Sequence, residues 1–308
     1  MINPISLVKE RLNFRDRAVL ITGASSGIGE DVAQALGRLG AQIGLIARRK
    51  AKLQELADRI VAEGGRALPL ACDVSRRSEV NEAVHHAANA FGKIDIVINS
   101  AGVLIPAHIE DTRFEDLDAM MRTNFYGMVH MVQAVLPLMR EAGSGQIVNI
   151  ASLAGRRGFS PIGAYSATKF AVVGFTEALR VELVGSGITA SLVMPGLIDT
   201  PMADGAISSN DNLGVLPKLA MPANWVTWAI IAALLFGWSE ISVPPGGAAL
   251  QKLSAFFPGA TDLMLSLGSR TLERYARFEQ YRRATAHEPL GEAQPQPSGA
   301  KRSSKRRL

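Results

Sequence analysis

The 308-residue sequence has a single cysteine, Cys72, which excludes a disulfide scaffold and a metal site built from cysteines. With thiols so rare, a reducing compartment is the default expectation. The five histidines include no pair at the spacing of zinc ligands, so we expect no bound metal. The longest apolar stretch, Val226 to Trp238, has 13 residues, and a bilayer span needs about 20. This stretch therefore predicts a buried helix.

Most of the chain has no excess of positive charge, although the formal net charge is +5. From Arg270 onward there are ten Lys/Arg and four Asp/Glu, whereas the first 269 residues hold 23 and 24. The body is therefore close to neutral, and we expect no nucleic-acid partner for it. The charged triplet Lys9-Glu10-Arg11 stands where a secretory signal would need an apolar run, so a cytoplasmic location is predicted.

Composition divides the chain into four segments. Residues 1–13 form a lead-in, 14–248 a single catalytic domain, 249–286 a helical extension, and 287–308 a basic tail. The tail is dominated by Pro, Gln, Ser, Gly and Lys/Arg, a composition that predicts disorder. Residues 200–222 are rich in Gly, Ser, Asn and Pro, and we expect a substrate loop there that acts as a lid.

Short, continuously apolar runs alternate with segments of helical period. Continuous hydrophobicity is typical of parallel strands that are covered on both faces. The alternation predicts an α/β fold with a doubly wound parallel sheet of about seven strands and a helical C-terminal appendage. The expected strands are 18–22, 43–47, 67–72, 94–99, 146–152, 188–194 and 240–243, and the expected helices are 27–38, 50–63, 78–91, 114–141 and 165–184.

A glycine-rich string, Thr22 to Gly29, links the first strand directly to the first helix. Gly23, Gly27 and Gly29 let the backbone turn tightly and approach a diphosphate, which the N–H groups of the helix terminus would bind. The other members of the string, Ser25, Ser26 and Ile28, would line the same site. A tight strand-to-helix turn without a ligand is the alternative interpretation.

The second strand ends in Ala47-Arg48-Arg49-Lys50, where a carboxylate would select NAD(H) by binding the ribose 2′-hydroxyl. Guanidinium groups suit a phosphate dianion, so Arg48 and Arg49 favour NADP(H). A solvated basic helix start is the alternative. Cations at a helix N-terminus oppose the macrodipole, which argues mildly for a ligand.

Tyr165 and Lys169 are four residues apart on an expected helix and so share a face. An ammonium beside a phenol should lower the phenol pKa and make it a usable proton donor and acceptor. Ser152 ends a strand, at the edge where catalytic groups of such sheets collect. Each feature alone has an alternative interpretation: Tyr165 and Lys169 could form an ordinary surface pair, and Ser152 could simply form a turn.

These residues belong to a longer series, which in order and spacing resembles the short-chain dehydrogenase/reductase family over about residues 14–245. The further members are Asp73-Val74, Asn99-Ser100-Ala101-Gly102, Asn124, Pro195-Gly196 and Thr200. Two departures stand out. Ser100 stands where the family more often has a second Asn, and the chain continues some sixty residues beyond the last expected strand.

The resemblance implies a Rossmann-like fold and a role for each matching residue. Tyr165 would be the general acid/base and Ser152 would orient the substrate oxygen. Lys169 would bind the nicotinamide ribose and lower the Tyr165 pKa, while Asn124 would anchor a water that relays protons. With the glycine motif and the arginines, the expected cofactor contacts are Gly23, Ser25, Ser26, Gly27, Ile28, Gly29, Arg48, Arg49, Asp73, Val74, Asn99, Ala101, Gly102, Tyr165, Lys169, Pro195, Gly196, Ile198 and Thr200.

The sequence thus predicts an NADP(H)-dependent oxidoreductase that interconverts a ketone or aldehyde and an alcohol, on a small hydrophobic substrate. The alternatives are a catalytically silent NADP(H)-binding scaffold or regulatory protein and a membrane-recruited interaction protein. We expect a homo-oligomer, with a dimer favoured. The apolar stretches 225–238 and 250–267 followed by the basic tail motivate a weaker expectation of peripheral membrane contact.

Two sets of apolar side chains have competing interpretations. Five methionines recur within one helical region and are expected to pack in the core or at a dimer contact; they are Met120, Met121, Met128, Met131 and Met139. The aromatic residues of the last apolar stretch would either line a substrate tunnel or pack as ordinary core; they are Trp225, Trp228, Phe236 and Trp238.

Overall fold

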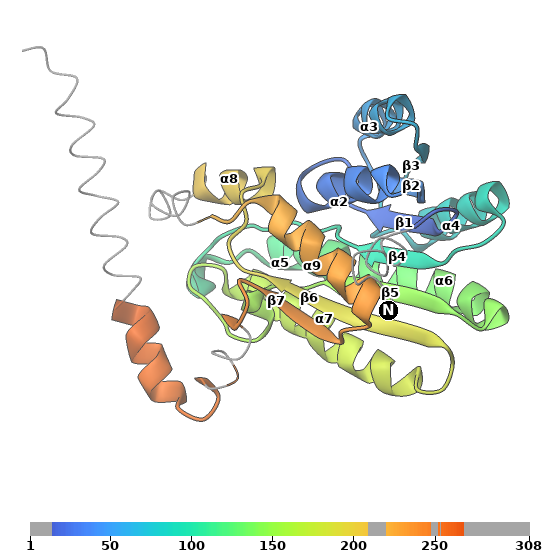
Figure 1. Cartoon of the computed structure of the whole chain (residues 1–308). Coiled ribbons are helices and arrows are strands. Elements are labelled where there is room, and N and C mark those ends of the chain that lie inside the picture. Colours follow the sequence, from blue (N-terminus) through green and yellow to red (C-terminus); the bar gives the residue numbers. More distant parts are fainter. Residues whose placement is uncertain (1–13, 209–219, 248–251, 253, 268–308) are drawn as a thin grey trace, which may run out of the picture.

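The computed structural model describes residues 14–208, 220–247, 252 and 254–267. Seven parallel strands form one sheet in the order β3-β2-β1-β4-β5-β6-β7 (Figure 1). The bounds are β1 Ala18–Thr22, β2 Gln42–Ala47, β3 Arg66–Ala71, β4 Ile96–Asn99, β5 Gly145–Ile150, β6 Ile188–Pro195 and β7 Glu240–Val243. The expected doubly wound parallel sheet is confirmed, and each strand lies within two residues of its predicted ends.

Helices cover both faces of the sheet, which explains the continuous hydrophobicity of the strands. On β1, Val19 and Ile21 pack in one core cluster and Leu20 in the other, because successive side chains point to opposite faces. The first face is covered by α2 (Gly27–Arg38), α3 (Lys50–Ala62) and α9 (Ala223–Phe236), and the second by α4 (Arg77–Phe91), α6 (Gly127–Ala142) and α7 (Gly163–Glu182).

The expected helix over 114–141 is interrupted. The structure has α5 (Phe114–Met121), one π-helical turn, η2 (Arg122–Tyr126), and then α6. The expectation of one unbroken helix is therefore wrong at this turn. Four of the five methionines on either side of it are buried, which confirms the core interpretation for Met120, Met128, Met131 and Met139; Met121 is only partly buried.

The strand order reverses beside β1, which pairs with β2 on one side and with β4 on the other. The hydroxyl of Thr22 accepts hydrogen bonds from the backbone N–H groups of Ser100 (3.0 Å) and Ala101 (3.1 Å). These bonds hold the ends of β1 and β4 together. In open parallel sheets, the carboxyl edge at such a reversal is where ligands bind.

Two expectations about the later part of the chain are corrected. Within the stretch expected to be a loop, Pro201–Ser208 forms a helix, α8; residues 209–219 lie outside the described residues. The aromatic side chains of the stretch ending at Trp238 do not lie in the core, and their expected place in a substrate tunnel stays a prediction. They are half or more exposed: Trp225 51%, Trp228 61%, Phe236 55% and Trp238 53%. α9 is thus buried on one face only.

The proposed lead-in (1–13) and basic tail (287–308) lie outside the described residues, as does most of the extension. Its described part, residue 252 and residues 254–267, includes a helix that lies beside the body of the molecule (Figure 1). Within the described ranges, no helix combines the length and apolarity needed to cross a membrane.

Candidate active site

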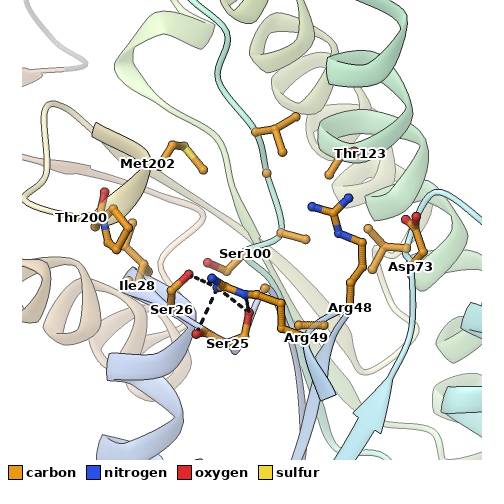
Figure 2. A pocket seen from close by; sticks show the side chains of 18 of the residues that line it. Ser25, Ser26, Ile28, Arg48, Arg49, Asp73, Ser100, Thr123, Thr200 and Met202 are labelled. Atoms are coloured by element: carbon orange, nitrogen blue, oxygen red, sulfur yellow. Dashed lines mark hydrogen bonds between the residues drawn. The ribbon is translucent and has the colours of Figure 1, made fainter. Parts of the chain in front are cut away.

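A cavity of about 280 Å³ lies at the carboxyl edge of the sheet, where the strand order reverses. Figure 2 shows its lining side chains converging from β1, β2, β3 and β4, with Thr200 and Met202 closing the side at α8. The predicted cofactor residues that line it are Gly23, Ser25, Ser26, Gly27, Ile28, Arg48, Arg49, Asp73, Val74, Ala101, Gly102 and Thr200.

The glycine turn has the geometry that a diphosphate site requires. Gly23 has φ of +70°, and a Cβ there would lie 2.9 Å from the Ala101 backbone. A Cβ on Gly29 would lie 2.5 Å from the Gly23 carbonyl oxygen, so only glycine lets α2 approach the turn this closely. The first turn of α2 has no side-chain cap from Ser26. Its N–H groups can therefore bind an anion, and the residues present fit a dinucleotide.

Arg49 and Arg48 lie differently, although both are exposed and line the cavity. The Arg49 guanidinium donates to the hydroxyls of Ser25 (2.8 Å) and Ser26 (2.7 Å). Figure 2 shows the Arg48 side chain reaching into the cavity, apart from the hydrogen bonds of Arg49 with the two serines. Two cations thus flank the end of β2, where an adenosine ribose would lie.

Asp73 and Asn99 illustrate the difference between a lining residue and a supporting one. Asp73 lines the cavity, and its Oδ1 accepts hydrogen bonds from the Ser75 N–H and hydroxyl. Asn99 does not line it: the side chain is buried and donates to Asn149 Oδ1 (2.8 Å) on the neighbouring strand β5. Asn99 therefore ties β4 to β5 from inside the core.

Tyr165 and Lys169 both lie on the buried side of α7, as their spacing predicts. The Lys169 Nζ donates to the Ile150 carbonyl at the end of β5 (2.9 Å) and lies 5.6 Å from the centroid of the Tyr165 ring. A Cβ on Gly102 would lie 3.8 Å from the same Nζ. Because Gly102 lines the cavity, the lysine lies beside the cavity and the tyrosine ring lies next to the lysine.

Ser152 joins this group from the end of β5. Its hydroxyl accepts from the Ala154 N–H (3.1 Å), donates to the Pro195 carbonyl (3.2 Å), and makes a side-chain hydrogen bond with Tyr165. The next residues form a short 3-10 turn, Leu153–Gly155, that packs against α7. Ser152 and Tyr165 therefore converge on one point, as the catalytic interpretation requires.

Asn124 is buried in the π-helical turn, and its side chain is fully engaged. It accepts from the Val103 N–H (2.7 Å) and donates to the Val103 carbonyl (2.9 Å) and the Thr168 hydroxyl (3.0 Å). The side chain thus fixes the backbone just beyond Gly102 to the helix that carries Lys169. Its expected role in anchoring a relay water stays a prediction.

Burial determines the protonation of the tyrosine and the lysine. It raises the pKa of Tyr165 to about 12, and the hydrogen bond with Ser152 only partly offsets this. It lowers the pKa of Lys169 to about 8. The expected lowering of the Tyr165 pKa by Lys169 is therefore not what this structure shows, because desolvation of the phenolate dominates.

The lowered pKa of Lys169 makes stability depend on pH. The folded protein releases this proton near pH 8, whereas the unfolded chain keeps it until about pH 10.5. Because the unfolded state binds more protons in that window, the free energy of unfolding rises with pH there. Between roughly pH 7 and pH 9.5, the free energy of unfolding of the wild type should rise by about 2 kcal/mol relative to that of Lys169→Met.

Urea unfolding of both proteins across that range measures the difference. Lys52→Met serves as the matched control, because Lys52 is exposed on α3 and pairs only with Glu55. A wild-type minus Lys169→Met difference that stays flat with pH would show that burial does not depress this ammonium.

Some predicted residues lie beside the cavity without lining it, and some lining residues were not predicted. The predicted residues that do not line the cavity are Gly29, Asn99, Tyr165, Lys169, Pro195, Gly196 and Ile198. The residues that line the cavity without having been predicted are Ala47, Cys72, Ser100, Val103, Thr123, Pro201 and Met202. Ala47 and Cys72 end strands at the edge already inferred, so strand position could have identified them. Met202 comes from α8, which the composition did not reveal.

Cys72 behaves as a packing residue even at the cavity. It is buried, and this burial raises the pKa of its thiol to about 12. The thiol is therefore neutral at physiological pH and lacks the thiolate character of a nucleophile.

The strand order of the seven-stranded sheet and the cavity at the β1–β4 reversal define a Rossmann-like fold, in which a serine, a tyrosine and a lysine lie beside the cavity. A family sequence model described as "short chain dehydrogenase" matches residues 17–211. The chain therefore belongs to the short-chain dehydrogenase/reductase family.

Relatives and solved structures agree with this assignment. An uncharacterized oxidoreductase of Staphylococcus aureus (strain MW2) is 36% identical over 230 residues, which cover 75% of this chain and 97% of the relative. One from Staphylococcus epidermidis is 36% identical over 233 residues, 75% of this chain and 98% of that protein.

Two solved structures contain different cofactors. A short-chain dehydrogenase/reductase from Burkholderia phymatum in complex with NAD has a TM-score of 0.74 and 26% identity, covering 79% of this chain and 94% of that one. A variant of actinorhodin polyketide ketoreductase with NADPH has a TM-score of 0.70 and 29% identity, with coverages of 75% and 96%. The family thus uses a nicotinamide cofactor, and the choice between the two rests on this chain's own residues.

Proposed function

We propose that the protein is an NADP(H)-dependent oxidoreductase that interconverts a ketone or aldehyde and the corresponding alcohol. The observation that carries this proposal is the convergence of Ser152, Tyr165 and Lys169 beside Gly102, which lines the cavity. The bound nicotinamide would supply or accept the hydride. The three side chains would handle the oxygen of the substrate and its proton.

The protonation of Tyr165 favours the reductive direction. With its pKa near 12, the phenol keeps its proton at neutral pH and can donate it to the oxygen of a carbonyl under reduction. Ser152 would hold that oxygen through its hydroxyl and stabilise the developing negative charge. Lys169 would bear a positive charge at neutral pH, since its pKa of about 8 is still above 7. That charge would favour the anionic oxygen.

The surroundings of Tyr165 favour an apolar substrate. The ring packs with Met120 and Ala154, and partly buried apolar side chains extend this cluster: Val103, Leu104, Ile105, Phe159, Ile162 and Ala164. A wall of this kind offers apolar contacts and few hydrogen-bonding groups, which suits a hydrophobic ketone or aldehyde.

A panel of ketones and aldehydes of graded apolarity, assayed by oxidation of NADPH, tests the proposal. Turnover that rises with substrate apolarity is the expected result. Cofactor binding without turnover on any member would favour the silent scaffold instead. The presence of both Tyr165 and Lys169 at the cavity speaks against that alternative. The cytoplasmic location and the dimer stay predictions.

The preference for NADP(H) rests on the cations at the end of β2. Arg48→Ala should raise the KM for NADPH by roughly 10- to 100-fold, because a charge-assisted bond to a 2′-phosphate contributes about 1.5–3 kcal/mol. The KM for NADH should barely change. Steady-state kinetics with both cofactors measure the two values.

Lys50→Ala is the control for general loss of positive charge. Lys50 is an equally exposed neighbour that does not line the cavity. If Arg48→Ala weakened NADPH and NADH alike, the phosphate assignment would be lost.

A further inference from the structure

The described part of the C-terminal extension is tied to the body of the molecule by two ion pairs. Asp262 pairs with Arg157, which follows the 3-10 turn after Ser152. Lys252 pairs with Glu240 at the start of β7 (3.3 Å). Within the described residues, no side chain of 254–267 belongs to the core clusters, and the helix lies beside the body (Figure 1).

The segment exposes large apolar side chains. Phe256 is 77% exposed and Phe257 is 64% exposed. A helix follows these two residues, and three of its side chains are also more than half exposed: Leu263, Met264 and Leu267. Positions 263, 264 and 267 share one helical face. We call these five residues the apolar face.

The apolar face has no charged side chains of its own that would favour contact with water. Asp262 is the one charged residue between positions 254 and 267, and its carboxylate is engaged by Arg157. The face that points away from this ion pair is therefore uncharged. Five large apolar side chains exposed together on one segment mark an interaction site.

The charge of the adjoining sequence identifies the partner. Residues 268–308 carry ten Lys/Arg and four Asp/Glu, directly after the apolar face. Such a combination complements a surface that is anionic outside and apolar beneath, which describes a lipid bilayer with anionic headgroups. A second copy of the chain would bring the same positive sequence against the first. A nucleic acid would leave Phe256 and Phe257 without a role.

We propose that the apolar face docks on an anionic lipid bilayer, with the basic residues that follow it binding the headgroups. The ion pair between Asp262 and Arg157 then couples the docked segment to the loop that begins at Ser152. This proposal concerns binding and is independent of the catalytic assignment.

Flotation of the full-length protein with vesicles tests the proposal. Wild type should float with vesicles of phosphatidylcholine and phosphatidylserine and much less with phosphatidylcholine alone. The double variant F256S/F257S should lower the partition coefficient by at least about tenfold, because two exposed aromatic rings no longer enter the interface.

The matched control removes two aromatic side chains elsewhere that are also more than half exposed. W225S/W228S changes two residues of α9 that are 51% and 61% exposed and lie far from the basic sequence along the chain. Flotation of this variant should equal that of wild type. Melting temperatures of both double variants should match wild type, which shows that the loss of binding is not unfolding.

Three results would overturn the proposal. The first is equal flotation of F256S/F257S and wild type. The second is loss of flotation in W225S/W228S alone, which would place the docking surface on α9. The third is a change of sedimentation coefficient in F256S/F257S without vesicles, which would show that the apolar face is covered by a second copy.

Discussion

Tyr165→Phe should lower kcat for carbonyl reduction by roughly 10²- to 10⁴-fold, the usual contribution of a positioned general acid. The substitution removes the phenolic hydroxyl and keeps the ring, so packing against Met120 and Ala154 should persist. Lys169 keeps its hydrogen bond to the Ile150 carbonyl. The dissociation constant for NADPH, measured by fluorescence titration, should therefore stay close to the wild-type value.

Tyr126→Phe provides the control. Tyr126 is 45% exposed in the π-helical turn, two residues after the buried Asn124. The same chemical change there should leave kcat unchanged. Wild-type turnover by Tyr165→Phe would show that another group donates the proton, and the assignment would fail while the fold and the cofactor site stood.

The strands were predictable because their signal is local. Ile43–Ala47 and Ile188–Met194 read as continuous apolar runs, and the sheet covers such runs on both faces. The residues that follow these runs then fall at one edge of the sheet by topology alone. Sequence alone therefore predicts that Gly23, Arg48 and Asp73 meet at one site, and all three line the cavity.

The π-helical turn could not be predicted in this way. Residues 122–126 contain neither proline nor glycine, and their hydrophobic pattern continues that of the flanking helices. The turn places Asn124 where its amide bonds Val103 and Thr168, which come from distant parts of the sequence. Single π turns often occur at functional sites, and here the stabilising contacts are tertiary.

The protonation of the site also depends on the tertiary structure. The spacing of Tyr165 and Lys169 correctly placed them on one helix face. Spacing carries no information on burial, which decides the direction of both shifts in pKa. The exposed face of α9 could not be predicted for a similar reason. Apolar residues occur on all sides of this helix, and only its packing shows that the face with Trp225 and Trp228 is exposed.

Ser152→Ala should lower kcat by roughly 10²- to 10³-fold, the effect of removing one hydrogen-bond donor from a developing oxyanion. The hydroxyl of Ser152 also caps the turn Leu153–Gly155 by accepting from the Ala154 N–H. Losing this cap should cost about 1 kcal/mol of stability. A catalytic loss of this size in a protein that is still folded therefore separates the chemical role from the structural one. Ser152→Thr keeps a hydroxyl and should recover much of the rate.

Ser186→Ala is the matched control for the structural part of that effect. The Ser186 hydroxyl accepts from the Ile188 N–H two residues later (3.2 Å) and donates to the Leu183 carbonyl (2.6 Å). It thus makes the same kinds of backbone bonds as Ser152, in a turn before β6 that does not line the cavity. Its removal should lower the melting temperature by a similar amount and leave kcat unchanged. If both alanine variants lost kcat equally, the effect at Ser152 would be structural, because oxygen stabilisation requires a hydroxyl beside Tyr165.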